Sequence, residues 1–160
     1  MNQVFLLIGG NLDDRFGLLS AAKEDISIEI GTILKESSIY ETAPWGFESE
    51  QDFLNQVIIV STSLSPIQVL RKCQIIEDRL GRVRKSEQYI SRTMDIDILF
   101  YNDEIMNTSE LIIPHERLHQ RRFTLEPLVE IAPNLMHPVI KKLLSELLNK
   151  CTDKAEVKKL

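Results

Sequence analysis

The order of strand-like and helix-like segments along the first hundred residues is the feature that most restricts the fold of this chain. Four short apolar or alternating runs are typical of β-strands, and they cover residues 4–8, 33–40, 53–62 and 93–101. One segment with helical spacing follows the first run, and another follows the third. The order strand, helix, strand, strand, helix, strand predicts a ferredoxin-like α+β fold, in which helices cover one face of an antiparallel sheet and leave the other open.

Both helices are bounded by residues that favour helix ends. Asp13 or Asp14 can cap the first helix, and Gly31 can end it. The second helix should begin at Ser65-Pro66, an N-cap followed by a proline at the first helical position, and end at Gly81. These boundaries support the proposed order of elements.

The remainder of the chain predicts loops, a hairpin and short helices. The long polar stretches 42–52 and 82–92 should be loops, whereas a hairpin is expected over 104–113 and helices over 123–131 and 140–149. A chain of 160 residues is the usual size of one domain, so we expect a single domain over 1–160. Its polar tail, 153–160, should be loosely held.

Charge and cysteine content exclude several classes of protein. The chain has 19 Lys+Arg against 24 Asp+Glu, and a net charge of −5 does not suit a nucleic-acid partner. The apolar run 4–8 is too short to span a bilayer and lacks the features of a signal peptide. Cys73 and Cys151 show no metal-binding spacing and suit free thiols in a reducing compartment. We therefore expect a cytoplasmic protein that binds neither membrane nor nucleic acid.

Two aspartates, Asp95 and Asp97, alternate with apolar residues in the fourth predicted strand. Alternate side chains of a strand share a face, so the two carboxylates should lie together on the open face, with Cα atoms about 6.6 Å apart. The opposite, buried face should receive Met94, Ile96, Ile98 and Phe100. Carboxylates at this spacing can hold one hard cation or flank two, although acids are also common on solvated strand faces. Aspartate is disfavoured in strands, which favours a functional role.

Basic residues gather in two clusters in this acidic chain. One is next to the aspartate pair and contains Arg79, Arg82, Arg84, Lys85 and Arg92; the other contains Arg117, Arg121 and Arg122. Metal-binding acids beside several guanidinium groups suit a polyphosphate, whereas either cluster alone equally suits scattered surface arginines. The sequence contains neither a P-loop motif nor a Rossmann glycine motif, so a nucleotide would be bound without them.

Aromatic, amide and other hydrogen-bonding residues occur within the third predicted strand and in the loop before it. Phe53 and Asn55 share one face of that strand, and Thr42, Trp45 and Gly46 lie in the preceding loop. An aromatic ring beside amide and backbone hydrogen-bonding groups suits a flat heteroaromatic ligand. Core packing explains Phe53 alone equally well.

Six segments occur in an order and spacing typical of one enzyme family. They are Gly9-Gly10-Asn11-Leu12, Tyr40-Glu41-Thr42-Ala43-Pro44-Trp45-Gly46, Phe53-Leu54-Asn55, Gly81-Arg82-Val83-Arg84, Arg92-Thr93-Met94-Asp95-Ile96-Asp97-Ile98-Leu99 and Pro114-His115-Glu116-Arg117-Leu118. With these segments the chain resembles hydroxymethyl-dihydropterin pyrophosphokinase of folate biosynthesis. The resemblance implies a ferredoxin-like fold and transfer of pyrophosphate from ATP to the hydroxymethyl group of a reduced pterin. ATP, the pterin alcohol and two Mg²⁺ ions would be the ligands of what we expect to be a monomer.

The resemblance also implies roles for individual residues. Asp95 and Asp97 would hold both magnesium ions, and Arg82 and Arg92 would assist the transfer. The ATP site would be lined by Gln74, Glu77, Arg84, Ile98, His115 and Arg121. The pterin would be hydrogen-bonded by Thr42, Gly46 and Asn55 and stacked by Phe53 and Phe123.

The chain departs from the family pattern in two places. Gln88-Tyr89-Ile90-Ser91 stands where relatives often have Arg-Trp-Gly-Pro, which loses a glycine and a proline from the 82–92 loop. In the predicted hairpin, Glu110 and Ile112 replace polar or basic residues that touch nucleotide in some relatives. The departures weaken the prediction of adenine contacts more than that of phosphate contacts.

Two other functions fit parts of the sequence. His115, Glu116 and His119 match the His-Glu-x-x-His motif of zinc metalloproteases, but Pro114 and the polar residues that follow do not suit the helix this motif requires. A non-enzymatic ferredoxin-like binding or regulatory module is the other alternative. Such a module needs neither paired acids nor converging arginines.

Overall fold

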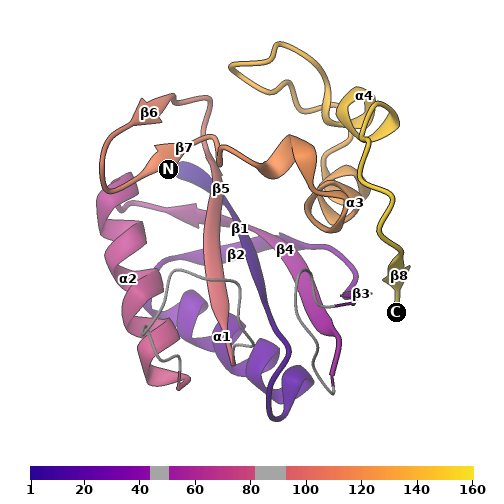
Figure 1. The fold of residues 1–160 in the computed structure, drawn as a ribbon. Coiled ribbons are helices and arrows are strands. Elements are labelled where there is room, and N and C mark those ends of the chain that lie inside the picture. Colours follow the sequence, from indigo (N-terminus) through magenta and orange to yellow (C-terminus); the bar gives the residue numbers. More distant parts are fainter. Residues whose placement is uncertain (44–50, 82–92) are drawn as a thin grey trace.

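The computed structural model describes residues 1–43, 51–81 and 93–160. Figure 1 shows one sheet with helices on both of its sides. Of the loop predicted over 42–52, Thr42 instead ends strand β3 (Tyr40–Thr42), and residues 44–50 lie outside the described residues. The loop predicted over 82–92 also lies outside them. The prediction of an antiparallel sheet with helices is confirmed by the pairing of the strands.

One antiparallel sheet contains most of the described strands. Its main path runs in the order β5-β1-β4-β3-β8, and β2 also pairs with β4. These strands are β1 (Asn2–Gly10), β2 (Thr32–Glu36), β3 (Tyr40–Thr42), β4 (Phe53–Thr62), β5 (Asp95–Tyr101) and β8 (Val157–Lys159). The predicted hairpin is present as β6 (Met106–Asn107) paired with β7 (Ile112–Ile113).

The strand predicted over 33–40 is divided into β2 and β3, so this prediction was wrong in its extent. The backbone N–H of Ser37 donates to the carbonyl of Val57 at 2.9 Å, and the Ser37 hydroxyl accepts from the Val57 N–H at 3.0 Å. The Ser37 hydroxyl thus accepts the hydrogen bond that a backbone carbonyl would accept in an uninterrupted strand pair. Three residues, 37–39, lie opposite two residues of β4 at this point, and the extra residue interrupts the strand.

The two long helices begin where the sequence predicts. In α1 (Arg15–Glu29), the Asp14 carboxylate accepts from the Gly17 N–H at 3.1 Å, which identifies Asp14 as the cap. In α2 (Pro66–Arg79), Ser65 and Gln68 form a reciprocal capping box. Gly81 follows with φ of +94°, a conformation that glycine adopts without strain.

The helices α1 and α2 cover one face of the sheet (Figure 1). Fully buried residues of the alternating strands meet them there, among them Val4, Leu6, Ile8, Leu54, Ile58, Ile96 and Ile98. Apolar positions of the helices complete this first core with Leu19, Ala22, Ile26, Val69, Cys73 and Ile76. The prediction of an inward face is confirmed for Met94, Ile96 and Ile98.

The opposite face is not open along its whole length, which corrects the prediction. The helices α3 (Arg122–Ile131) and α4 (Leu144–Asn149) pack on part of it and form a second core. The sheet contributes Phe5, Leu7, Val57, Ile59, Leu99 and Phe100 to this core. The helix predicted over 140–149 begins only at Leu144, because residues 137–143 form a turn in which Lys141 has φ of +62°.

Phe100 lies on the opposite face from the one predicted. β1 pairs Phe5 with Phe100 but Leu6 with Ile98, so Leu99 is an extra residue in the β5 register. Beyond this bulge the alternation reverses. The Phe100 ring therefore packs edge-to-face on Phe5 in the second core, with ring centroids 5.6 Å apart.

The end of the chain forms an edge strand. β8 pairs with β3, with Thr42 opposite Val157 and Tyr40 opposite Lys159. Within the tail 153–160 that was predicted to be loosely held, Val157–Lys159 therefore continue the sheet. Across the residues that the structure describes, no helix combines the length and apolar character needed to cross a membrane.

Candidate functional site

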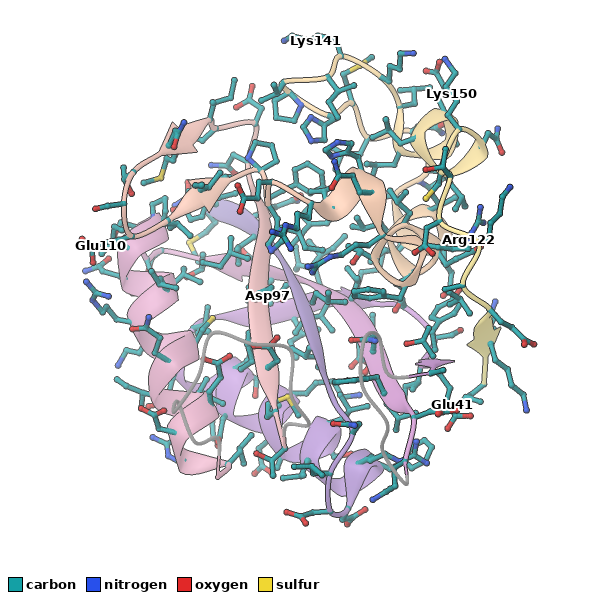
Figure 2. All side chains as sticks on the ribbon, in the orientation of Figure 1. Glu41, Asp97, Glu110, Arg122, Lys141 and Lys150 are labelled. Atoms are coloured by element: carbon teal, nitrogen blue, oxygen red, sulfur yellow. The ribbon has the colours of Figure 1, made fainter. Side chains whose placement is uncertain are left out.

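A pocket of about 700 Å³ occupies the part of the sheet face that α3 and α4 leave uncovered. The strands, the segment after β7, the start of α3 and the C-terminal segment all contribute to its lining. The lining residues include Gly9, Thr42, Phe53, Asn55, Asp95, Asp97, His115, Arg117, Arg121, Phe123, Thr152, Asp153 and Ala155. In Figure 2, Asp97 is labelled on β5 near the centre of the molecule.

The central strand β1 arranges the polar residues of the pocket in rows. Gly9 is paired with Asn55 of β4 on one side and with Asp95 of β5 on the other. Two residues earlier, on the same face, Leu7 is paired with Val57 and Asp97. Strand alternation therefore places both aspartates and Asn55 on the pocket face, which the sequence predicts for the two aspartates.

Gly9 is required by the close approach of β4. A Cβ at this position would lie 2.2 Å from the Leu54 carbonyl oxygen and 2.4 Å from Oδ1 of Asn55. The Asn55 side chain therefore lies over the bare backbone of Gly9, where it remains within the pocket.

Asp95 and Asp97 are both half-buried, while Ile96 between them is buried against the helices. The carboxylate of Glu77 in α2 is itself buried and accepts a 2.8 Å hydrogen bond from the Ile96 N–H. This bond ties β5 to α2 from the side opposite the pocket. The two aspartates are thus presented by a strand that is held on its other face.

The donor set suits Mg²⁺ bound together with a phosphate ligand. In the described part of the chain there is no group of three or more His, Cys, Asp or Glu residues that could hold a metal alone. Magnesium is usually held by one or two carboxylates together with substrate phosphates and water. Two carboxylates on one strand face, within a pocket that also contains arginines, fit that pattern.

His115 lies on the pocket wall next to the arginines. Its backbone N–H donates to the Leu99 carbonyl at 3.0 Å, and its Nδ1 accepts from the Arg117 N–H at 3.2 Å. Burial, and secondarily the positive charge of Arg121, lowers the pKa of His115 below its ordinary value. The imidazole is therefore neutral at pH 7, with Nε2 available as a donor.

The aromatic end of the pocket is formed by β3, β4 and α3. Thr42 and Phe53 are directly paired across β3 and β4, and Phe123 is the second residue of α3. The Arg121 guanidinium lies 5.5 Å from the centroid of the Phe123 ring, a cation–π distance. A flat ring between Phe53 and Phe123 would thus be next to a guanidinium group.

The structure brings most of the described candidate residues into this pocket. Those that line it are Thr42, Phe53, Asn55, Asp95, Asp97, His115, Arg121 and Phe123. Three others do not line it, because Glu77 and Ile98 are buried on the helix side of β5 and Gln74 lies on α2. Gly46, Arg82, Arg84 and Arg92, together with Trp45 and Tyr89, lie outside the described residues.

Several lining residues were not singled out from the sequence. Leu7 has the same strand parity as Gly9, so alternation could have indicated it. Gln120 adjoins the second arginine cluster. Thr152, Asp153 and Ala155 belong to a short polar segment without any recognisable motif, so no local signal indicated them.

The His-Glu-x-x-His match does not form a zinc-binding helix. Only Leu118–Gln120 of this region is helical, as a single 3-10 turn. The His119 ring instead lies against the His137 ring, with centroids 6.3 Å apart. Without an α-helix, the spacing of the two motif histidines does not place them on one face.

The glutamate of the predicted hairpin pairs with a helix residue. Glu110 forms an ion pair with Arg71 of α2, and both side chains are about half exposed. Glu110 is labelled in Figure 2 at the edge of the molecule, away from Asp97.

Comparison with known proteins gives consistent matches. The family model described as 7,8-dihydro-6-hydroxymethylpterin-pyrophosphokinase (HPPK) matches residues 5–133. The "2-amino-4-hydroxy-6-hydroxymethyldihydropteridine pyrophosphokinase" of Aquifex aeolicus is 40% identical over 146 residues, which cover 91% of this chain and 90% of the relative. The protein of the same name from Porphyromonas gingivalis is 44% identical over 138 residues, which cover 84% of this chain and 93% of the relative.

Solved structures show the same fold. The Plasmodium falciparum HPPK-DHPS wild type with pteroate superimposes with a TM-score of 0.74 at 19% identity over 93% of this chain. The matched region is 42% of that longer chain, so this chain spans less than half of it. The family match over residues 5–133, and relatives at 40% identity or more over most of both chains, lead to one assignment. This chain belongs to the 7,8-dihydro-6-hydroxymethylpterin-pyrophosphokinase family.

Proposed function

We propose that this chain transfers the pyrophosphoryl group of ATP to the hydroxymethyl group of 6-hydroxymethyl-7,8-dihydropterin, giving AMP and the pterin diphosphate. One observation carries the proposal: a single pocket contains paired strand carboxylates at one end and aromatic and amide side chains at the other, with Arg121 also in its lining. A polyphosphate and a flat heteroaromatic ring are the two ligands that these ends suit. The chain belongs to a family of pyrophosphokinases, and pyrophosphoryl transfer is the reaction that uses both of these ligands.

The carboxylate end is the proposed site of the triphosphate. Asp95 and Asp97 would hold two Mg²⁺ ions, which neutralise phosphate charge and polarise phosphoryl oxygens when bound. Arg121 would bind phosphate oxygens through its guanidinium, and the neutral His115 would donate from Nε2. We further propose roles for Arg82, Arg84 and Arg92 in phosphate binding and transfer, and for Gln74, Glu77 and Ile98 in supporting the nucleotide side. For Glu77 this support is positional, since its carboxylate holds the Ile96 N–H.

The aromatic end is the proposed site of the pterin. Asn55 and Thr42 would hydrogen-bond the heteroatoms of the ring, together with Gly46. Phe53 and Phe123 would stack on its two faces. Because β3, β4 and β1 are adjacent in the sheet, this arrangement would aim the hydroxymethyl group towards β5 and the triphosphate.

The reaction depends chiefly on placement and charge neutralisation. The hydroxymethyl oxygen forms a bond to the β-phosphorus of ATP, and the bond from that phosphorus to the bridging oxygen of the departing AMP breaks. The hydroxyl proton leaves to solvent. Two ligands held at adjacent ends of one pocket supply the orientation that such an in-line displacement requires.

The strand order supports a ferredoxin-like classification of the central unit. With β2 and β3 together as the second strand, the sheet order β5-β1-β4-β3 corresponds to fourth, first, third and second. We also propose that the chain acts as one domain and as a monomer in the cytoplasm. The two free, buried cysteines support a reducing compartment.

An assay with the full chain tests the function. The protein is incubated with ATP, Mg²⁺ and the reduced pterin alcohol, and nucleotide products are separated. AMP formed in equal amount to a pterin diphosphate, and only when the pterin is present, is the expected result. ADP in place of AMP would contradict the proposal by showing cleavage at the γ-phosphate, and no nucleotide conversion would contradict it in favour of a binding module.

A further inference from the structure

We propose that the C-terminal segment 151–159 forms a wall of the pocket, and that Asp153 is a positioning residue for Phe123. The segment would thereby govern binding of the pterin rather than of ATP. This inference rests on the function proposed above, because it assigns the two ends of the pocket to those ligands.

The wall comes from a part of the chain beyond the family match. That match ends at residue 133, whereas Thr152, Asp153 and Ala155 all line the pocket. These three residues follow α4 and precede β8. The pocket of this chain is therefore completed by residues that the family pattern does not describe.

Asp153 holds the first turn of α3 from outside that helix. Its Oδ2 accepts from the backbone N–H of Arg122 at 3.0 Å, and its Oδ1 accepts from the Ala155 N–H at 3.0 Å. Arg121, the residue at the N-cap position of α3, makes no side-chain cap hydrogen bond. Asp153 thus satisfies one of the N–H groups that every helix leaves unpaired at its start.

The side chain of Arg122 also joins α3 to the C-terminal segment. Its Nε donates to the Asp153 carbonyl at 2.9 Å, and its Nη1 pairs with Glu126 of α3 at 3.1 Å. Figure 2 shows Arg122 between α3 and the C-terminal segment. Phe123 comes directly after Arg122, so the backbone that presents this ring to the pocket is held by Asp153.

A second attachment joins the segment to the opposite side of the aromatic end. β8 pairs with β3, and Thr42 lies opposite Val157. Lys159 of β8 also forms an ion pair with Glu130 of α3 at 3.6 Å. The segment therefore links α3 and β3, the two elements that contribute Phe123 and Thr42.

The sheet order separates this wall from the carboxylates. β8 and β3 lie at one end of the order β5-β1-β4-β3-β8, and β5 with Asp95 and Asp97 lies at the other. A disturbance of the wall should therefore reach the aromatic end first. This predicts a change in pterin binding with little change in ATP binding.

The test compares Asp153→Ala and Asp153→Asn with Lys154→Ala, an exposed neighbour that does not line the pocket. In the full chain, Asp153→Ala should raise the KM for the pterin on the order of tenfold and leave the KM for ATP within about twofold. Asp153→Asn keeps one acceptor oxygen and should give a smaller rise in the same constant. Lys154→Ala should match the parent protein.

A second variant keeps the inference testable if Asp153→Ala does not fold. Thr152 is exposed and lines the pocket, so Thr152→Trp should fill part of the aromatic end without removing the Asp153 hydrogen bonds. It should also raise the KM for the pterin selectively. Unchanged constants in Asp153→Asn and Thr152→Trp, or an equal rise for both substrates, would overturn the inference.

Equilibrium binding of the pterin alcohol, measured by calorimetry, separates this inference from the proposed reaction. A parent protein that binds the pterin but produces no AMP would contradict the proposed function alone. Weaker pterin binding by the Asp153 and Thr152 variants would still support the proposed role of segment 151–159 in pterin binding. If parent and variant proteins have the same pterin affinity, the proposed role of segment 151–159 is contradicted even if the reaction proceeds.

Discussion

The sheet face opposite α1 and α2 has two halves built by the same strands, and they differ in what covers them. At one end of β1, Phe5 is flanked by Ile59 and Phe100, and α3 and α4 bury this half. At the other end, Gly9 is flanked by Asn55 and Asp95, and the face opens into the pocket. The same strands pair in both halves, with one register shift at Leu99, and side-chain size and polarity decide which half is covered.

The two halves also differ in how deeply their ionisable groups are buried. His137 is buried in the covered half, where burial lowers its pKa to about 4. Its ring packs edge-to-face on Phe100, with centroids 5.7 Å apart. The pocket instead leaves its two aspartates half-exposed in its lining. A change in the open half should therefore affect catalysis, and one in the covered half should affect stability.

The sharpest test of this division is Asp97→Ala. Loss of one metal-binding carboxylate should lower kcat/KM on the order of 10⁴-fold, or ~5 kcal/mol of transition-state stabilisation. The melting temperature should stay within a few degrees of the parent value, because Asp97 is half-buried and lines the pocket. Asp103→Ala, at an exposed position outside the pocket, is the matched control. Near-normal magnesium-dependent turnover by Asp97→Ala would remove the metal assignment.

Phe100→Ala is the corresponding change in the covered half. Truncation of this fully buried ring should lower the free energy of unfolding by about 3–5 kcal/mol, as measured by urea denaturation. The folded variant should keep the KM values of the parent, since Phe100 does not line the pocket. A loss of substrate affinity at full stability would show that the halves are not separable.

Gly9→Ala changes the open half, at the close approach of β1 and β4. The added Cβ would require β4 to move away from β1, which should lower the free energy of unfolding by about 1–3 kcal/mol. Displacement of the Asn55 side chain should also raise the KM for the pterin. Denaturation and steady-state kinetics on one preparation measure both effects. If stability fell while the KM for the pterin stayed the same, Asn55 would not be a pterin ligand.

The smallest expected effect is the pH dependence of stability from His137. Its pKa is about 4 in the fold and ~6.5 in the unfolded chain, so the unfolded state binds the proton more readily between these values. The free energy of unfolding should therefore fall as the pH drops below about 6.5, by about 1–2 kcal/mol between pH 7 and pH 5. Denaturation at both pH values, compared with His137→Gln, isolates this contribution. An equal decline in that variant would assign the effect to other groups.

Much of the architecture was accessible from local sequence signals. Asp14 and the Ser65–Gln68 box act within one helical turn, so helix starts can be read from a few adjacent residues. Strand alternation likewise placed Asp95 and Asp97 on one face, and Phe53 and Asn55 on one face, because it depends only on backbone geometry. The continuous apolar run 57–60 also indicated burial of β4 on both faces, a signal that the prediction of an open face overlooked.

By itself, the sequence determined the helix caps, the strand alternation and the residue types available to the site, since each depends on near neighbours. Only the tertiary structure decided the bulge at Leu99, the cover over half of the sheet and the C-terminal wall. Phe100 faces the second core because a register shift against β1 reverses the local alternation. Asp153 reaches α3 because β8 pairs with β3, and such pairings join residues too distant in sequence for any local pattern to specify.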